Sequence, residues 1–253
     1  MDRIARVRSE SGFYHVVSRG NNKRPIFSDD VDRHRFLKLL QDCCAQYDIN
    51  IIAWCLMSNH VHLLLEDLHG QLSEAMKRLL GGYAAYFNAR TGRIGHLFQG
   101  RFSSRAIDTD AYLLECVRYI HNNPANAHVA PADIYPWSSY REYMSEANIT
   151  ATGLILDMLD GPEGFSRFVA DRDACTYCFG GTRAMSDEDA RRIARAIARQ
   201  RGIDLALIKD MSHARRVDLA LAMEDAGLMQ RQIAEAIGTS KASVARMLKL
   251  RQR

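Results

Sequence analysis

Strand and helix patterns alternate along the first part of this 253-residue chain, and their order restricts its fold more than any other feature. Short runs rich in β-branched and aromatic residues predict four strands, at residues 12–19, 49–57, 60–66 and 101–107. Apolar residues at helical spacing predict helices at 29–47 and 70–89. The resulting β-α-β-β-α-β order predicts an α+β fold in which helices back an antiparallel sheet.

The chain changes in character after the fourth predicted strand. Asp108 or Thr109 can cap a helix that ends at Asn122-Asn123-Pro124, because proline disfavours helical conformation in the residue before it. Glycine and proline then recur, and helix-like segments follow them. We therefore predict three parts, an α+β domain at 1–145, a linker region at 146–182 and a helical domain at 183–253.

Basic residues gather in the predicted helical domain. Residues 183–253 hold 15 Lys and Arg against 9 Asp and Glu, a net charge of +6, whereas the rest of the chain carries −2. A basic domain predicts a polyanionic partner such as DNA, and the alternative is an ordinary solvated surface. No run of about 18 apolar residues and no signal-peptide core occurs, so we expect a cytoplasmic protein without a membrane partner.

The third predicted strand contains two histidines at H-x-H spacing. Side chains alternate along a strand, so His60 and His62 project from one face and Val61 projects from the other. Two imidazoles on one rigid face can hold one cation. The alternative is a pair of partly exposed or hydrogen-bonded histidines, because H-x-H is a common pattern.

The helix predicted before Pro124 places a phenol beside an amide. Tyr119 and Asn123 are one turn apart, which offers a nucleophile and an oxygen ligand that would complete a two-histidine cation site. Alternatively, Tyr119 is a core aromatic residue whose hydroxyl is bonded locally. Glu115 lies one turn before Tyr119 and is a substitute for Asn123 as ligand, with a solvated surface position as its alternative.

Four segments together resemble the single-tyrosine HUH transposases, particularly the REP-associated tyrosine transposases, over roughly residues 1–145. They are YHVVSRGN at 14–21, MSNHVH at 57–62, HLFQGRF at 96–102 and YIHNNP at 119–124. The resemblance implies a ferredoxin-like nuclease fold in which His60, His62 and Asn123 hold Mg²⁺ or Mn²⁺ and Tyr119 is the nucleophile. The third ligand varies within the resemblance.

The resemblance also implies the reaction, which is cleavage and strand transfer of single-stranded hairpin DNA such as REP palindromes. A phenol with a pKa near 10 is mostly protonated at neutral pH, so a cation beside Tyr119 would favour the phenolate. Attack on phosphorus gives a 5′-phosphotyrosine link and a 3′-hydroxyl, and reversal rejoins strands without external energy. A cytoplasmic, nucleoid-associated transposase follows from this interpretation, as a monomer or a homodimer.

Basic residues in two regions are candidates for gripping the DNA backbone. In the first domain they follow the first predicted strand or lie around the Gly-rich stretch, at Arg19, Lys23, Arg24, Arg101 and Arg105. In the second, residues 230–248 have helix-turn-helix spacing with Gly238 at the turn. Its second helix would expose Ser240, Lys241, Ser243 and Arg246 to duplex DNA, and an ordinary helical hairpin is the alternative.

Two other functions remain open at this point. A domesticated DNA-binding regulator would use the helix-turn-helix while the first domain recognises hairpins without cleaving them. A metal-dependent phosphodiesterase would use water as the nucleophile and leave Tyr119 a structural role.

Overall fold

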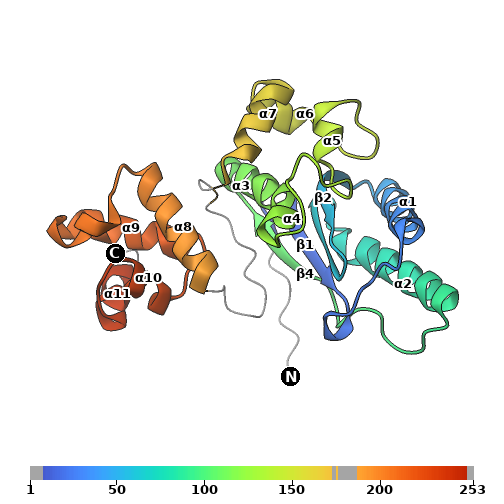
Figure 1. The fold of residues 1–253 in the computed structure, drawn as a ribbon, viewed down its shortest axis with the longest axis horizontal. Helices are drawn as coiled ribbons and strands as arrows, with labels where there is room; N and C mark the ends of the chain where they lie inside the picture. The colour runs from blue at the N-terminus through green and yellow to red at the C-terminus, as the bar shows by residue number, and fades with distance from the viewer. Residues whose placement is uncertain (1–7, 173–174, 176–186, 250–253) are drawn as a thin grey trace. The chain divides into compact units, whose positions relative to one another are not determined.

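The computed structural model describes residues 8–172, 175 and 187–249, and the chain divides into two compact units between Ala170 and Asp171. The first unit contains a four-stranded sheet with helices, and the second is helical in its described part (Figure 1). None of the helices in the described part of the chain combines the length and the apolar run that crossing a membrane requires.

The sheet of the first unit has the strand order β2-β3-β1-β4, and every neighbouring pair is antiparallel. Its strands are β1 (Phe13–Arg19), β2 (Asn50–Leu56), β3 (His60–Glu66) and β4 (Ser103–Ile107). Helix α1 (Asp30–Gln46) joins β1 to β2, and α2 (Leu72–Thr91) joins β3 to β4. This order is that of a ferredoxin-like fold, which confirms the predicted α+β class and its element order.

The two faces of the sheet are covered by different helices (Figure 1). Tyr14, Val16 and Leu63 belong to one face, where they form a continuous core with buried side chains of α1 and α2. Strand alternation turns His15 and His62 to the other face, which α3 (Asp110–His121) covers through contacts with β2 and β3. The face of β3 that carries the predicted histidine pair is therefore the face covered by α3, the helix that carries the predicted nucleophile.

Helix α3 begins and ends close to its predicted limits. Thr109 caps its start by accepting a hydrogen bond from the backbone N–H of Tyr112. The helix ends at His121, and a short helix α4 (Asn123–Asn126) follows directly, with Pro124 in its first turn where a missing N–H is tolerated. Asn123 thus opens a new helix instead of continuing α3, while it remains one turn beyond Tyr119.

The segment after residue 145 differs from our expectation of a linker that extends to residue 182. The short helix α5 (Tyr140–Met144) is followed by α6 (Gly153–Met158) and α7 (Gly161–Ala170), all within the first unit. Phe165 stacks on Tyr143 with ring centroids 4.3 Å apart, and Asn122 donates a hydrogen bond to the carbonyl of Val169. Because α7 supplies buried apolar residues to this packing, the first unit extends to Ala170.

The second unit is all-α over its described residues. It comprises α8 (Asp187–Gln200), a 3-10 helix at Leu205–Asp210, α9 (His213–Asp225), α10 (Gln230–Ala236) and α11 (Lys241–Leu248). Gly238, with a φ of 63°, makes the turn between α10 and α11 as predicted, and Ile233, Ile237, Val244 and Leu248 are buried in the core of this unit.

Candidate active site

His60 and His62 lie side by side at one end of β3. Their rings are 4.9 Å apart between centroids and nearly perpendicular. The antiparallel pairing with β1 places Arg19 opposite His60 and Val17 opposite His62. His62 is 3% exposed and His60 is half-buried, so a ligand could reach the pair from the His60 side.

Tyr119 reaches the same place from α3. Its ring lies edge-on to the ring of His62, with centroids 5.6 Å apart. It is half-buried, unlike its neighbours Arg118 and Ile120, which are buried. The structure therefore brings the predicted nucleophile to the predicted histidine pair, although Tyr119 and His62 are far apart in the sequence.

Asn123 completes this group. Its side chain hydrogen-bonds to His60, which raises the pKa of His60, but burial and the charge of Arg19 have the larger effect and lower that pKa to about 4. The four residues that the sequence predicted as nucleophile and metal ligands thus gather at one position, where β3, α3 and the start of α4 meet.

His15 is a member of this site that the sequence analysis missed. It lies on β1, is fully buried, and its Nε2 is 2.9 Å from Nδ1 of His62. Its ring is also edge-on to Tyr119, with centroids 5.8 Å apart. The sequence does show that His15 and Arg19 project from the same face of their strand, because they are four residues apart. Only the β1–β3 register shows that this is the face on which His62 lies.

The histidines of the site are neutral at pH 7. Burial is the main cause that lowers the pKa of His15 and of His62 well below 6.5, and nearby positive charge adds to it in both cases. On His15 that charge comes from Arg105, its cross-strand partner on β4. A neutral imidazole keeps a nitrogen lone pair, which is the form that binds a metal cation.

The donor set is consistent with a divalent cation that keeps part of its shell for other ligands. Within residues 8–172, 175 and 187–249, no group of three or more His, Cys, Asp or Glu side chains is placed to hold a metal ion. The carboxamide of Asn123, which hydrogen-bonds to His60, is a further oxygen donor beside the two imidazoles. Two imidazoles and one amide oxygen suit such a cation if water or phosphate oxygens complete its coordination.

Glu115 is not solvated, so that part of our expectation is wrong. The residue is 9% exposed, and its carboxylate accepts a hydrogen bond from Arg118 at 2.9 Å. Arg118 in turn donates to the carbonyl of Phe168 in α7 and stacks over the Phe168 ring. This buried ion pair ties α3 to α7, which explains why an acidic residue is found inside the first unit.

The predicted DNA-gripping residues of the first unit lie in segments that border the site. Arg19 is exposed at the end of β1, and Lys23 and Arg24 are exposed in the loop that follows. Asn59, beside His60, holds this loop: its side-chain amide donates to the carbonyl of Lys23, and its own carbonyl accepts from Gly20. The backbone of the loop that carries Lys23 and Arg24 is thus held against Asn59, the residue before His60.

The remaining two cations of this set precede or belong to β4. Arg101 is exposed just before the strand. Arg105 lies opposite His15 in the sheet, and its guanidinium stacks over Tyr112 at 4.8 Å. The loop before β4 is joined to β1, because the N–H of Gln99 donates to the carbonyl of Arg19. Both arginines therefore belong to the sheet end or sheet face that carries the histidines.

In the second unit, the predicted DNA-reading residues lie along α11, with Ser240, Lys241 and Ser243 at its start and Arg246 in its last turn. Ser240 caps this helix by accepting a hydrogen bond from the N–H of Ser243. Lys241 and Arg246 are exposed. These four side chains form a polar and basic surface of the kind that recognition helices present to DNA.

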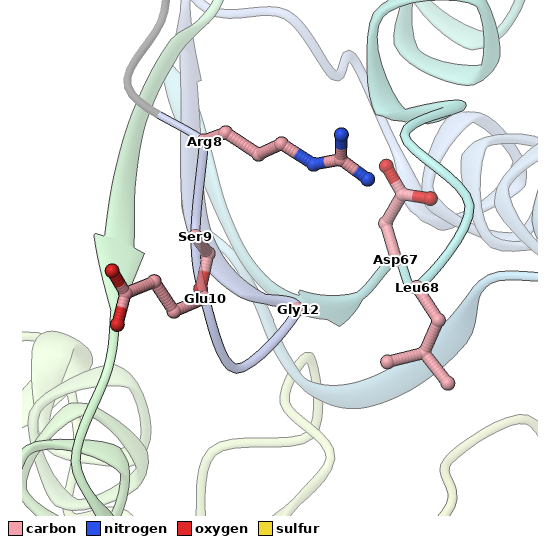
Figure 2. A pocket seen from close by; sticks show the side chains of 6 residues that line it. All are labelled: Arg8, Ser9, Glu10, Gly12, Asp67 and Leu68. Atoms are coloured by element: carbon pink, nitrogen blue, oxygen red, sulfur yellow. The ribbon is translucent and has the colours of Figure 1, made fainter.

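A hollow elsewhere in the first unit is separate from this group. It is lined by Arg8, Ser9, Glu10, Gly12, Asp67 and Leu68, whose side chains Figure 2 shows around the start of β1 and the end of β3. The β1–β3 register places Phe13 opposite Glu66 at that end and Arg19 opposite His60 at the other. None of the converging residues lines this hollow.

A search of curated proteins finds none that matches. Among solved structures, the chain is similar to a REP-associated tyrosine transposase bound to a REP hairpin, at 17% identity over 58% of this chain and 87% of that chain, with a TM-score of 0.49. It is also similar to a candidate transposase from Deinococcus radiodurans R1, at 19% identity over 48% of this chain and 97% of that chain, with a TM-score of 0.34.

A family model gives a further match. Residues 9–123 match the model described as "Transposase IS200 like". The matched stretch begins just before β1 and ends at Asn123, so it contains the whole sheet, helices α1 to α3 and every residue that converges at the candidate site.

Proposed function

We propose that this chain is a transposase-type enzyme that cleaves and rejoins single-stranded DNA, with Tyr119 as nucleophile, and the match of residues 9–123 to the IS200-like transposase model supports this. One observation carries the proposal: Tyr119 of α3 lies edge-on to His62 of β3, beside His60 and Asn123. A nucleophile next to a pair of residues that can bind a cation is an arrangement that supports phosphodiester transfer.

His60, His62 and Asn123 would hold the divalent cation, Mg²⁺ or Mn²⁺, that the HUH resemblance implies. When bound, the cation would supply positive charge that favours the phenolate of Tyr119 and neutralises charge growing on the scissile phosphate. The residues themselves contribute rigid placement, because β3 fixes the two imidazoles and the helix ends around residues 121–123 fix the amide.

The proposed step conserves the phosphodiester as an ester. The phenol oxygen of Tyr119 forms a bond to phosphorus, the bond from phosphorus to the 3′-oxygen breaks, and the departing oxygen gains a proton while the phenol loses one. The products are a 5′-phosphotyrosine and a free 3′-hydroxyl. Attack by another 3′-hydroxyl reverses the step and restores Tyr119, so rejoining needs no nucleotide cofactor.

Arg19, Lys23, Arg24, Arg101 and Arg105 are proposed to hold the DNA backbone beside Tyr119. Arg19 lies across the sheet from His60, and Asn59 joins the Lys23 loop to the same turn. Cations at fixed positions around the nucleophile would position a phosphate without reading its base. Hairpins of the REP type remain the proposed substrate, on the basis of the four motifs that the sequence shares with the REP-associated enzymes.

One assay tests the nucleophile. Labelled hairpin single strands are incubated with the full chain and Mn²⁺, and the products are separated under denaturing conditions. We expect a covalent protein–DNA adduct that disappears in Tyr119→Phe and persists in the control Tyr86→Phe, since Tyr86 is a half-buried tyrosine of α2, beneath the other face of the sheet. Cleavage without an adduct would support a water nucleophile and contradict the proposal.

The regulator alternative is favoured by one observation, the two exposed cations of α11, Lys241 and Arg246. Under that alternative, Lys241 and Arg246 bind duplex DNA while the first unit only holds hairpins. The double variant Lys241→Ala/Arg246→Ala is expected to weaken duplex binding and to leave the adduct yield on a short hairpin unchanged. Tight hairpin binding with no adduct in the wild type would establish the regulator instead.

A further inference from the structure

His15 has no part in the chemistry proposed above, yet its position is unusual for a histidine. It is fully buried in the middle of β1, and its polar contact toward the site is the 2.9 Å hydrogen bond between its Nε2 and Nδ1 of His62. His62 is almost as deeply buried. Water cannot replace this bond, so losing it would leave a buried ring nitrogen without that partner.

The bond to His15 decides which nitrogen of His62 faces the site. A neutral imidazole carries its proton on one ring nitrogen and its lone pair on the other. If Nδ1 of His62 donates to His15, the lone pair of His62 is on Nε2. The partner that holds the second nitrogen therefore fixes both the tautomer and the ring orientation of a ligand.

His60 shows the same arrangement with a different partner. Its Nδ1 lies 2.6 Å from the side-chain oxygen of Asn59, and an amide oxygen can only accept, so Nδ1 of His60 carries the proton. Both histidines of the pair then present Nε2. Agreement between two independent partners is what a shared cation would require.

We propose that His15 is a positioning residue that accepts the Nδ1–H of His62 and directs His62 Nε2 toward the divalent cation. The inference rests on the proposed function of the site. It also accounts for the choice of side chain, because an imidazole next to Arg105 holds His62 without adding a negative charge where a DNA phosphate must bind.

The test measures Mn²⁺ binding to the full chain by calorimetry, without DNA. His15→Phe keeps an aromatic ring and removes the acceptor, and we expect its Kd for Mn²⁺ to rise about 10- to 100-fold. His15→Gln places an amide oxygen near the position of Nε2 and is expected to restore most of the affinity. Nitrogen-15 NMR of the histidine rings should show the His62 proton on Nδ1 in the wild type and a mixture of tautomers in His15→Phe.

His121→Phe is the matched control. His121 is also fully buried and hydrogen-bonded, through Nε2 to Ser139 and Nδ1 to the carbonyl of Val117, but it does not contact the histidine pair. It should lower the melting temperature without changing the Kd for Mn²⁺. The inference is overturned if His15→Phe binds Mn²⁺ like the wild type, or if His15→Gln binds as weakly as His15→Phe.

Failure of this inference can be told apart from failure of the proposed function. If the wild type forms no covalent adduct with hairpin DNA, the role of Tyr119 as nucleophile is refuted. If its Mn²⁺ binding is nevertheless lost in His62→Ala, the Kd for Mn²⁺ of each His15 variant can still be measured and still tests the inference. If the His62→Ala variant binds Mn²⁺ as tightly as the wild type, the inference is overturned directly, because His62 is then not a ligand that His15 could position.

Discussion

The two faces of the sheet in the first unit use the same strands for opposite purposes. On the face under α1 and α2, the interior positions of β1 and β3 are apolar or aromatic, as with Val16 and Leu65. On the face under α3, the same strands bury His15 and His62. Burying imidazoles is less favourable than burying aliphatic side chains, so the second face is less stabilising at the position of the candidate site.

The difference implies that stability and activity should respond separately to substitutions on the two faces. The first face is stabilised by the hydrophobic effect, so truncating one of its buried side chains should lower the free energy of unfolding. The second face gains little from its histidines beyond their hydrogen bonds, so replacing them should affect catalysis more than folding.

The largest effect is expected from the histidine pair itself. We expect His62→Ala to lower the rate of adduct formation about 10³-fold, because the charge stabilisation that a cation provides amounts to several kcal/mol. Quantitative adduct assays at saturating Mn²⁺ measure this rate. An unchanged rate in a folded His62→Ala protein would remove the functional meaning of the histidine face.

Leu65→Ala on the opposite face should show the reverse behaviour. Leu65 is fully buried in the core under α1 and α2, and truncation there should lower the free energy of unfolding by about 2–5 kcal/mol. The adduct rate per folded molecule should stay near that of the wild type at a temperature where the variant is folded. Urea denaturation and the adduct assay together decide whether the two faces are independent.

The sequence predicted those features of the histidine face that depend on residues close together in the chain. Period two in strands and 3.6 in helices placed His60 with His62 and Tyr119 with Asn123, and the structure brings the two pairs together as the motifs predicted. The partner of His62 could not be found this way, because contact with His15 depends on the register between two strands that are distant in the sequence.

The extent of the first unit was missed for a different reason. We interpreted recurring glycine and proline after residue 145 as a linker. Gly164, however, lies within α7 where a Cβ would collide with the carbonyl oxygen of Leu159, so it permits close packing, and Pro162 occupies the first helical turn. Composition does not distinguish a glycine that packs from a glycine that loosens the chain.

The pH dependence of stability gives a smaller effect that also separates the faces. Burial lowers the pKa of His60 to about 4 and of His121 to about 3, and it lowers those of His15 and His62 as well. The unfolded chain therefore binds more protons than the folded chain below about pH 6.5, and the free energy of unfolding should fall as pH drops from there toward 4.

This fall is measured by denaturation in EDTA at a series of pH values. His121→Phe should reduce the slope by about one proton. Leu65→Ala should shift the whole curve downward and leave its slope unchanged, since no titrating group is altered. A slope that is equally steep in His121→Phe would show that other groups control the acid sensitivity.

The smallest effect is expected from single cations at the rim of the histidine site. Arg24 is exposed in the loop that Asn59 fixes beside His60, and it should contact one phosphate of bound DNA. We expect Arg24→Ala to weaken hairpin binding uniformly across sequences and to reduce the slope of log Kd against log salt by about one. Lys77→Ala is the control, because Lys77 is also an exposed cation and belongs to α2, beneath the apolar face. If Lys77→Ala changes the salt slope as much as Arg24→Ala, DNA does not distinguish the two sides of the sheet, and the cations near His60 are no more than general surface charge.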